Sequence, residues 1–138
     1  MYQEINYEIM RRVLKFRTWD GEKMISPDFV DRDGVAWWRE NSIPERSEIV
    51  MQFTGLLSGK GEEIYEGDIL RMPGNYNYTR VVEWYKIGLR VKQINGGGNF
   101  PLHYPFVGQT GNETDWEIIG NIYENPELLL EGNPEKGK

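Results

Sequence analysis

Apolar and polar residues alternate along several short stretches of the chain, and this period of two is typical of β-strands. The clearest case begins at Val50, where Met51 and Phe53 alternate with Gln52 and Thr54. Glycines and charged residues follow, and a second apolar run is entered through residues 66–68. Glycine frees the backbone for a tight reversal. The pattern predicts a strand, a turn and a second strand within residues 51–71.

Alternation and a high content of β-branched and aromatic residues predict further strands elsewhere. They span residues 11–18, 23–25, 79–85, 87–94 and 116–123. Between the first two, Asp20-Gly21 favours a type I′ hairpin turn. Gly120 allows a bend or bulge in the last strand. Asn125-Pro126-Glu127 combines an N-cap residue, a proline at the first helical position and an acid in the first turn, which predicts one short helix ending at Leu130.

The segments between these elements are rich in turn residues. Residues 27–48, 72–77 and 95–112 show no sustained period and are predicted to be irregular. Sixteen glycines and seven prolines indicate many short elements joined by turns. We therefore expect a mainly β fold, a small barrel-like antiparallel domain with long loops and one short C-terminal helix. The predicted division is an N-terminal extension at residues 1–10, one β domain at 11–131 and a polar tail at 132–138.

Composition restricts the classes of function. The 138 residues include no cysteine, which excludes disulfides, thiolate zinc sites and cysteine nucleophiles. No apolar run approaches the ~20 residues that a membrane helix needs, and no apolar leader follows a basic start. We expect a cytoplasmic protein without membrane contact. The net charge of −6 argues against a general binder of phosphate backbones.

Three motifs that suggest chemistry do not meet the requirements of that chemistry. Residues 55–60 resemble a phosphate-binding loop but are one residue too short, and no long helix follows. Residues 31–34 lack the remaining ligands of a calcium loop. His103 is the only histidine, and no serine lies in a nucleophile elbow. The sequence therefore predicts no cofactor, no metal site and no catalytic residue. An enzyme would require a carboxylate cluster, such as Asp20 with Asp68, in one cleft.

Aromatic residues in or beside the predicted loops are the better candidates for binding, since binding residues concentrate in loops. Trp37 and Trp38 are adjacent, so on a strand they would face opposite sides. The predicted interface residues are Trp37, Trp38, Phe100, Tyr104 and Phe106. A stacking surface for single-stranded nucleic acid is the alternative, and its candidates are Tyr76, Tyr78, Arg80, Arg90 and Lys92. Packing of these rings in the core is the default interpretation against which both are weighed, since a small β domain must bury large rings somewhere.

Four blocks of the sequence resemble the YopX family of phage and prophage proteins. They are residues 16–24 (Phe-Arg-Thr-Trp-Asp-Gly-Glu-Lys-Met), a central block of residues 52–56 and 61–71, residues 82–84 and residues 117–128. Thr18 stands where alanine is common in the family, and residues 1–10, 27–48 and 95–114 match no block. The resemblance implies a mostly-β phage accessory protein that forms oligomers. It implies no established activity, so it assigns no catalytic residues.

These observations favour an accessory interaction protein that self-associates and binds an unidentified protein partner, and they disfavour an enzyme. The first alternative is a nucleic-acid-associated accessory factor. The second is an enzyme that uses a carboxylate cluster such as Asp20 with Asp68.

Overall fold

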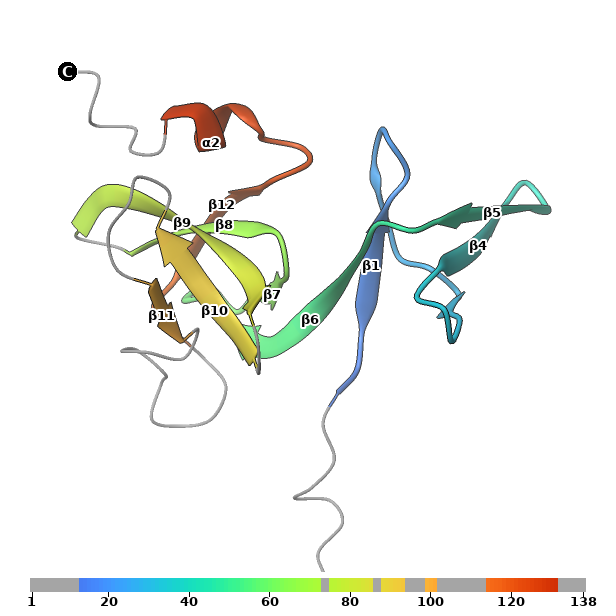
Figure 1. The fold of residues 1–138 in the computed structure, drawn as a ribbon, viewed down its shortest axis with the longest axis horizontal. Coiled ribbons are helices and arrows are strands. Elements are labelled where there is room, and N and C mark those ends of the chain that lie inside the picture. Colours follow the sequence, from blue (N-terminus) through green and yellow to red (C-terminus); the bar gives the residue numbers. More distant parts are fainter. Residues whose placement is uncertain (1–12, 73–74, 86–87, 94–98, 102–113, 132–138) are drawn as a thin grey trace, which may run out of the picture.

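The structure, a computed structural model, describes residues 13–72, 75–85, 88–93, 99–101 and 114–131. Within them the chain forms short strands and one helix (Figure 1). In chain order these are β1 (Phe16–Trp19), β2 (Met24–Ile25), β3 (Phe29–Val30), β4 (Ala36–Glu40), β5 (Ile43–Ser47), β6 (Val50–Leu57), β7 (Glu63–Tyr65), β8 (Asp68–Met72), β9 (Asn75–Tyr85), β10 (Gly88–Gln93), β11 (Asn99–Pro101), β12 (Glu117–Asn121) and α2 (Glu127–Glu131).

The described strands form three antiparallel sheets. Their orders are β2-β1-β6-β7, β11-β10-β9-β8-β12 and β3-β4-β5. Strand β6 links β1 to β7, because its first residues pair with β1 and its last residues pair with β7. Its register shifts between Phe53 and Leu57, around Gly55 with a φ of 86°. In Figure 1 the β3–β5 sheet lies on one side of β1 and the curled five-stranded sheet on the other.

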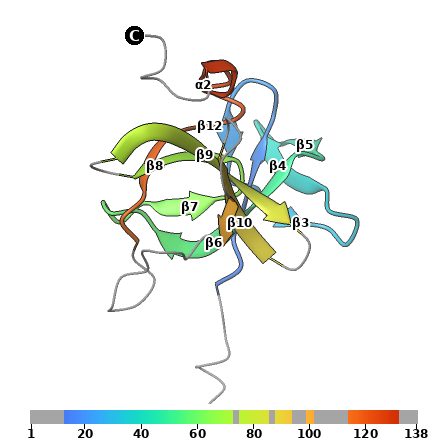
Figure 2. The same cartoon turned by 60° about the vertical axis from the view of Figure 1, so that its left-hand side comes forward.

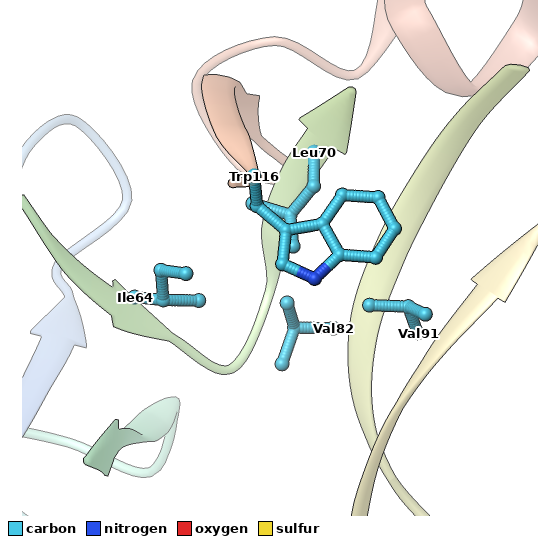
Figure 3. Packing of buried hydrophobic residues seen from close by; sticks show 5 residues of the cluster. All are labelled: Ile64, Leu70, Val82, Val91 and Trp116. Carbon is cyan, nitrogen blue, oxygen red and sulfur yellow. The ribbon is translucent and has the colours of Figure 1, made fainter. Parts of the chain in front are cut away.

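The main hydrophobic core lies inside the curl of the larger sheet. Its fully or almost fully buried residues come from β7, β8, β9, β10 and the segment before β12, and they are Ile64, Leu70, Val82, Val91 and Trp116 (Figure 3). The register pairs Val82 with Val91, so both side chains lie on one face of the sheet. Figure 2 shows how β6 and β7 lie across this sheet and enclose that face. The expected mainly β, antiparallel fold with a short C-terminal helix is confirmed.

The segment predicted to be irregular, residues 27–48, instead contains the β3-β4-β5 sheet. Asn41 and Ser42 join β4 to β5 and have φ values of 52° and 66°. Positive φ at both central residues is the requirement of a type I′ hairpin turn. Pro44 lies in β5, at the open edge of the sheet, where a missing N–H costs no ladder hydrogen bond.

Two turns also differ from expectation in detail. The first hairpin exists, but Trp19 pairs with Met24, so its loop runs through residues 20–23. The Asp20 carboxylate accepts hydrogen bonds from the N–H groups of Glu22 and Lys23 at 2.7 and 2.8 Å, and Asp20 lacks the positive φ of a type I′ turn. At α2, Asn125 accepts the N–H of Leu128 through its backbone carbonyl rather than its side chain.

The strand predicted at residues 11–18 begins at Phe16 among the described residues. The predicted extension and tail, residues 1–10 and 132–138, lie outside the described residues, so the division into three parts stays a prediction. No helix within the described ranges is long and apolar enough to cross a membrane.

Candidate protein-interaction surface

The two adjacent tryptophans of β4 face opposite sides of the β3-β4-β5 sheet, as strand geometry requires. Trp38 is 8% exposed and lies on the same side as the buried Ala36. Trp37 lies on the other side, where the register places Phe29 of β3 and Arg46 of β5 as its direct neighbours. Trp37 is thus the tryptophan of this pair that a partner can reach in this conformation.

Phe29, Trp37 and Arg46 form a continuous row across the three strands, called here the aromatic–arginine row. The Phe29 and Trp37 rings stack with centroids 6.4 Å apart and an interplanar angle of 15°. The guanidinium carbon of Arg46 lies over the Trp37 ring, 5.7 Å from its centroid. Phe29 is 58% exposed, so the row presents an aromatic surface to solvent.

Asp31 fixes the orientation of Trp37. Its Oδ2 accepts the indole N–H of Trp37 at 2.8 Å, and its Oδ1 accepts the backbone N–H groups of Asp33 and Val35 at 2.9 and 3.0 Å. These bonds, the one from Trp37 first, lower the pKa of the Asp31 carboxyl below its ordinary value. In the turn at residues 31–34, which resembles a calcium loop, the Asp31 carboxylate therefore holds the Trp37 indole ring in place.

A groove with a mixed polar and apolar lining continues the surface from Phe29 toward the start of β1. It has a volume of about 260 Å³ and is lined by Leu14, Phe16, Pro27, Phe29, Val30 and Tyr65, together with the polar residues Ser26 and Asp28. Leu14 is 57% exposed. Lys15, which also lines the groove, forms an ion pair with Glu63. We call this the Leu14–Phe29 groove. Because Phe29 belongs to both features, the groove and the aromatic–arginine row form one surface.

A second groove, of about 470 Å³, is polar. Arg17 and Asp68 lie in it, with Glu62, Glu63, Ile118, Gly120, Asn121, Glu124 and Asn125. The Arg17 Nη2 donates to Asp68 Oδ1 at 2.8 Å and to the carbonyl of Glu66 at 3.2 Å. Asp68 Oδ2 accepts the N–H of Tyr65 at 2.8 Å. Burial raises the pKa of the Asp68 carboxyl, and the Arg17 charge opposes that rise.

The C-terminal wall of the polar groove is a closed hydrogen-bond network. Asn121 Oδ1 accepts the N–H groups of Tyr123 and Glu124, and its Nδ2 donates to the Glu124 carboxylate at 2.7 Å. Asn125 Oδ1 accepts the Asn121 N–H at 3.1 Å. Three of the blocks that resemble the YopX family thus meet here. Their polar groups bind one another, which indicates a structural junction of β1, β8 and β12.

The carboxylates required for the enzyme alternative are not brought together. Asp20 lies in the exposed turn after β1 and is not part of the polar groove, whereas Asp68 is buried against Arg17. Within the described residues, no group of three or more His, Cys, Asp or Glu side chains could hold a metal ion.

The cations proposed for nucleic acid lie on different faces of the five-stranded sheet. Arg90 and Lys92 share one face, and Arg90 donates to Glu83 at 2.6 Å. Arg80 lies on the core face with its guanidinium over the Trp116 ring, 5.5 Å from the centroid. Tyr76, Tyr78 and Phe100 lie in strands β9 and β11, while Tyr104 and Phe106 lie outside the described residues. Their predicted roles stay predictions.

Leu14, Phe29 and Arg46 were not among the predicted interface residues. The association of Phe29 and Arg46 with Trp37 depends on the pairing of β3, β4 and β5, and Leu14 joins them through the groove. No local sequence pattern brings these positions together. Trp37 was predicted correctly to have a side chain opposite to that of Trp38, since strand alternation alone requires it.

The comparisons with known proteins agree with the fold. The protein EF1440 from Enterococcus faecalis, known from a crystal structure, is 21% identical, with a TM-score of 0.50; the match covers 86% of this chain and 99% of that one. At this identity the similarity concerns the fold alone. The comparison with curated proteins gave no significant match. The family model described as YopX protein matches residues 15–130, and the chain therefore belongs to the YopX family.

Proposed function

We propose that this chain is a phage or prophage accessory protein that acts in the host cytoplasm by binding protein, including a second copy of itself, and catalyses no reaction. The observation that carries this proposal is the continuous surface formed by the Leu14–Phe29 groove and the aromatic–arginine row. Tryptophan, other aromatic residues and arginine are the residue types that most often anchor protein interfaces.

Exposed apolar residues need an explanation only when they are contiguous. Leu14 and Phe29 line the same groove, and Phe29 stacks on Trp37. Covering such a side chain in an interface gains about 1.5–3 kcal/mol relative to leaving it in water. We place self-association in the Leu14–Phe29 groove, because Leu14 and Phe29 line it with side chains that are more than half exposed and its Lys15 is already paired with Glu63.

The nucleic-acid alternative has weaker support. The chain carries a net charge of −6, and single-stranded nucleic acid is held by a positively charged groove lined with stacking rings. Arg80 and Arg90 interact with Trp116 and Glu83, and they lie on opposite faces of the sheet. No single face of the described strands holds all three cations of that hypothesis, since Arg90 and Lys92 lie opposite Arg80.

The solution mass tests self-association. Light scattering should give the wild-type protein a mass that is a multiple of the chain mass, and Phe29→Ala should shift it toward the monomer, since the truncation removes the ring shared by groove and row. Trp84→Ala is the matched control: Trp84 is 54% exposed, similar to Phe29, but lies on β9. A wild-type monomer at the highest accessible concentration, or equal shifts in both variants, would contradict self-association through this groove.

A further inference from the structure

Charges are segregated between the two faces of the β3-β4-β5 sheet. Residues paired across antiparallel strands share a face, so Trp37 with Arg46 and Arg39 with Pro44 lie on one side. The pairs Trp38 with Glu45 and Glu40 with Ile43 lie on the other side. Both arginines of β4 and β5 therefore lie beside the exposed aromatic rings, and both glutamates of these strands lie opposite. The Asp31 carboxylate, bonded to the Trp37 indole, also lies beside these rings, so this face combines two guanidinium groups with one carboxylate in a chain of net charge −6.

The two arginines retain hydrogen-bond donors. Arg39 donates one N–H to the carbonyl of Ser42 at 3.2 Å, and Arg46 contacts the Trp37 ring through its guanidinium. Neither forms an ion pair within the part of the chain that the structure describes. A guanidinium has five N–H donors, arranged to bind a carboxylate at two points. Both side chains are exposed, so these donors are accessible to a ligand.

The aromatic part of the face is held in place before any ligand arrives. Trp37 is stacked on Phe29 from one side and bonded to Asp31 through its indole N–H. The Asp31 carboxylate, although it interacts with the charge of Arg46, already accepts three N–H groups. A ligand thus meets a fixed ring surface, and binding does not require the rings to be ordered first.

The dimensions of the row fit a repeat of three residues. Neighbouring strands lie about 4.8 Å apart, so the two strand spacings from Phe29 to Arg46 amount to about 10 Å. A polyproline II segment rises about 3.1 Å per residue with three residues per turn, which places side chains about 9.3 Å apart on one side. Aromatic surfaces commonly recognise such segments because their conformation is already extended.

We propose that this face binds an extended, acidic segment of a partner protein, with a proline or another apolar side chain on Phe29 and Trp37 and a carboxylate one turn later on Arg46. Arg39 takes a second carboxylate. This inference rests on the proposed function in one respect, which is that the partner is a protein. Phosphate-backbone recognition fits less well, because the face has two cations and the chain as a whole is acidic.

Fluorescence anisotropy with a defined probe tests this. The probe is a fluorescein-labelled peptide, Gly-Pro-Pro-Glu-Pro-Pro-Glu-Gly, whose glutamates recur every third residue. The matched peptides carry glutamine or lysine instead of glutamate, and an oligothymidylate represents nucleic acid. Binding of the glutamate peptide should be roughly tenfold or more tighter than that of the glutamine peptide, since charge-assisted bidentate bonds are about twice as strong as neutral ones.

Variants locate the contact. Arg46→Glu and Trp37→Ala should each weaken binding of the glutamate peptide by roughly tenfold or more, as expected for central arginine and tryptophan anchors. Arg32→Glu makes the same charge change in the exposed turn at residues 31–34, at a position that is not among the paired residues of β3, β4 and β5. It should leave binding within about twofold if bulk charge is not the cause.

Three results would overturn the inference: no binding of the glutamate peptide, equal binding of the glutamine peptide, or equal losses in Arg32→Glu and Arg46→Glu. Preferential binding of oligothymidylate would assign the face to nucleic acid instead. These results are distinct from failure of self-association. If the protein forms a Phe29-dependent oligomer but does not bind the peptide, the proposed function stands and only the acidic-segment inference is contradicted.

Discussion

Asp68→Ala is expected to lower the free energy of unfolding by about 3–5 kcal/mol, because removing one member of a buried ion pair leaves the other charge buried and unpaired. The side chains of Asp68 and Arg17 are 3% and 16% exposed, and their atoms approach to 2.8 Å. The substitution also removes the acceptor of the Tyr65 N–H at the turn before β8. Urea unfolding followed by circular dichroism measures the change.

Two control experiments distinguish the loss of the buried ion pair from a general effect of charge on stability. The double variant Arg17→Met/Asp68→Ala should lose less stability than the sum of the losses in the two single variants. The second substitution removes the charge that the first leaves buried and unpaired. Glu40→Ala breaks the exposed pair with Lys23 and should leave the unfolding midpoint unchanged. Additive losses in the double variant would contradict the assignment of Arg17 and Asp68 as an energetically coupled pair.

Gly120→Ala is expected to lower the free energy of unfolding by about 1–3 kcal/mol, because the added methyl group overpacks the site. A Cβ at this position would lie 2.4 Å from Oδ1 and 2.7 Å from Cγ of Asn125. Asn125 cannot simply move away, because its Oδ1 accepts the Asn121 N–H and its own N–H donates to the Asn121 carbonyl at 2.9 Å. Thermal unfolding of the variant reports the loss.

Gly88→Ala is the matched control for this site. Gly88 also lies in a strand of the five-stranded sheet, but nothing lies within 4 Å of an added Cβ. It should leave the melting temperature near that of the wild type. In the Asn125→Ala background, which lacks the two closest atoms, Gly120→Ala should cost less than it does alone. An equal cost in both backgrounds would show that contact with Asn125 is not the cause.

Local patterns predicted the elements whose signals are local. The alternation around Met51 and Phe53 predicted β6, and β-branched content predicted β9, since a half-buried strand must present one apolar face. The bulge expected at Gly120 is confirmed by the register shift between Ile118 and Gly120. The same patterns did not predict β3–β5. Strand β5 is almost wholly exposed, so it has no alternating apolar face, and it contains Pro44, a residue that argues against a strand.

The candidate interaction surface was less predictable than the fold because its parts are joined only by strand pairing. The Phe29–Trp37 stack requires the register of β3 against β4. The Arg17–Asp68 pair joins residues 51 positions apart. No local spacing encodes either contact. The candidates at Tyr104 and Phe106 lie outside the described residues, so the structure neither supports nor opposes their predicted role.

Site-specific photocrosslinking tests most directly the central claim, that the surface around Phe29 contacts another protein chain. Benzoylphenylalanine would replace Phe29 in one sample and Trp84 in a matched sample, both being exposed aromatic positions. Irradiation of the purified protein should give a covalent dimer from position 29 and little from position 84, and Leu14→Ser should suppress it. No dimer at position 29, or equal yields from both positions, would contradict the claim.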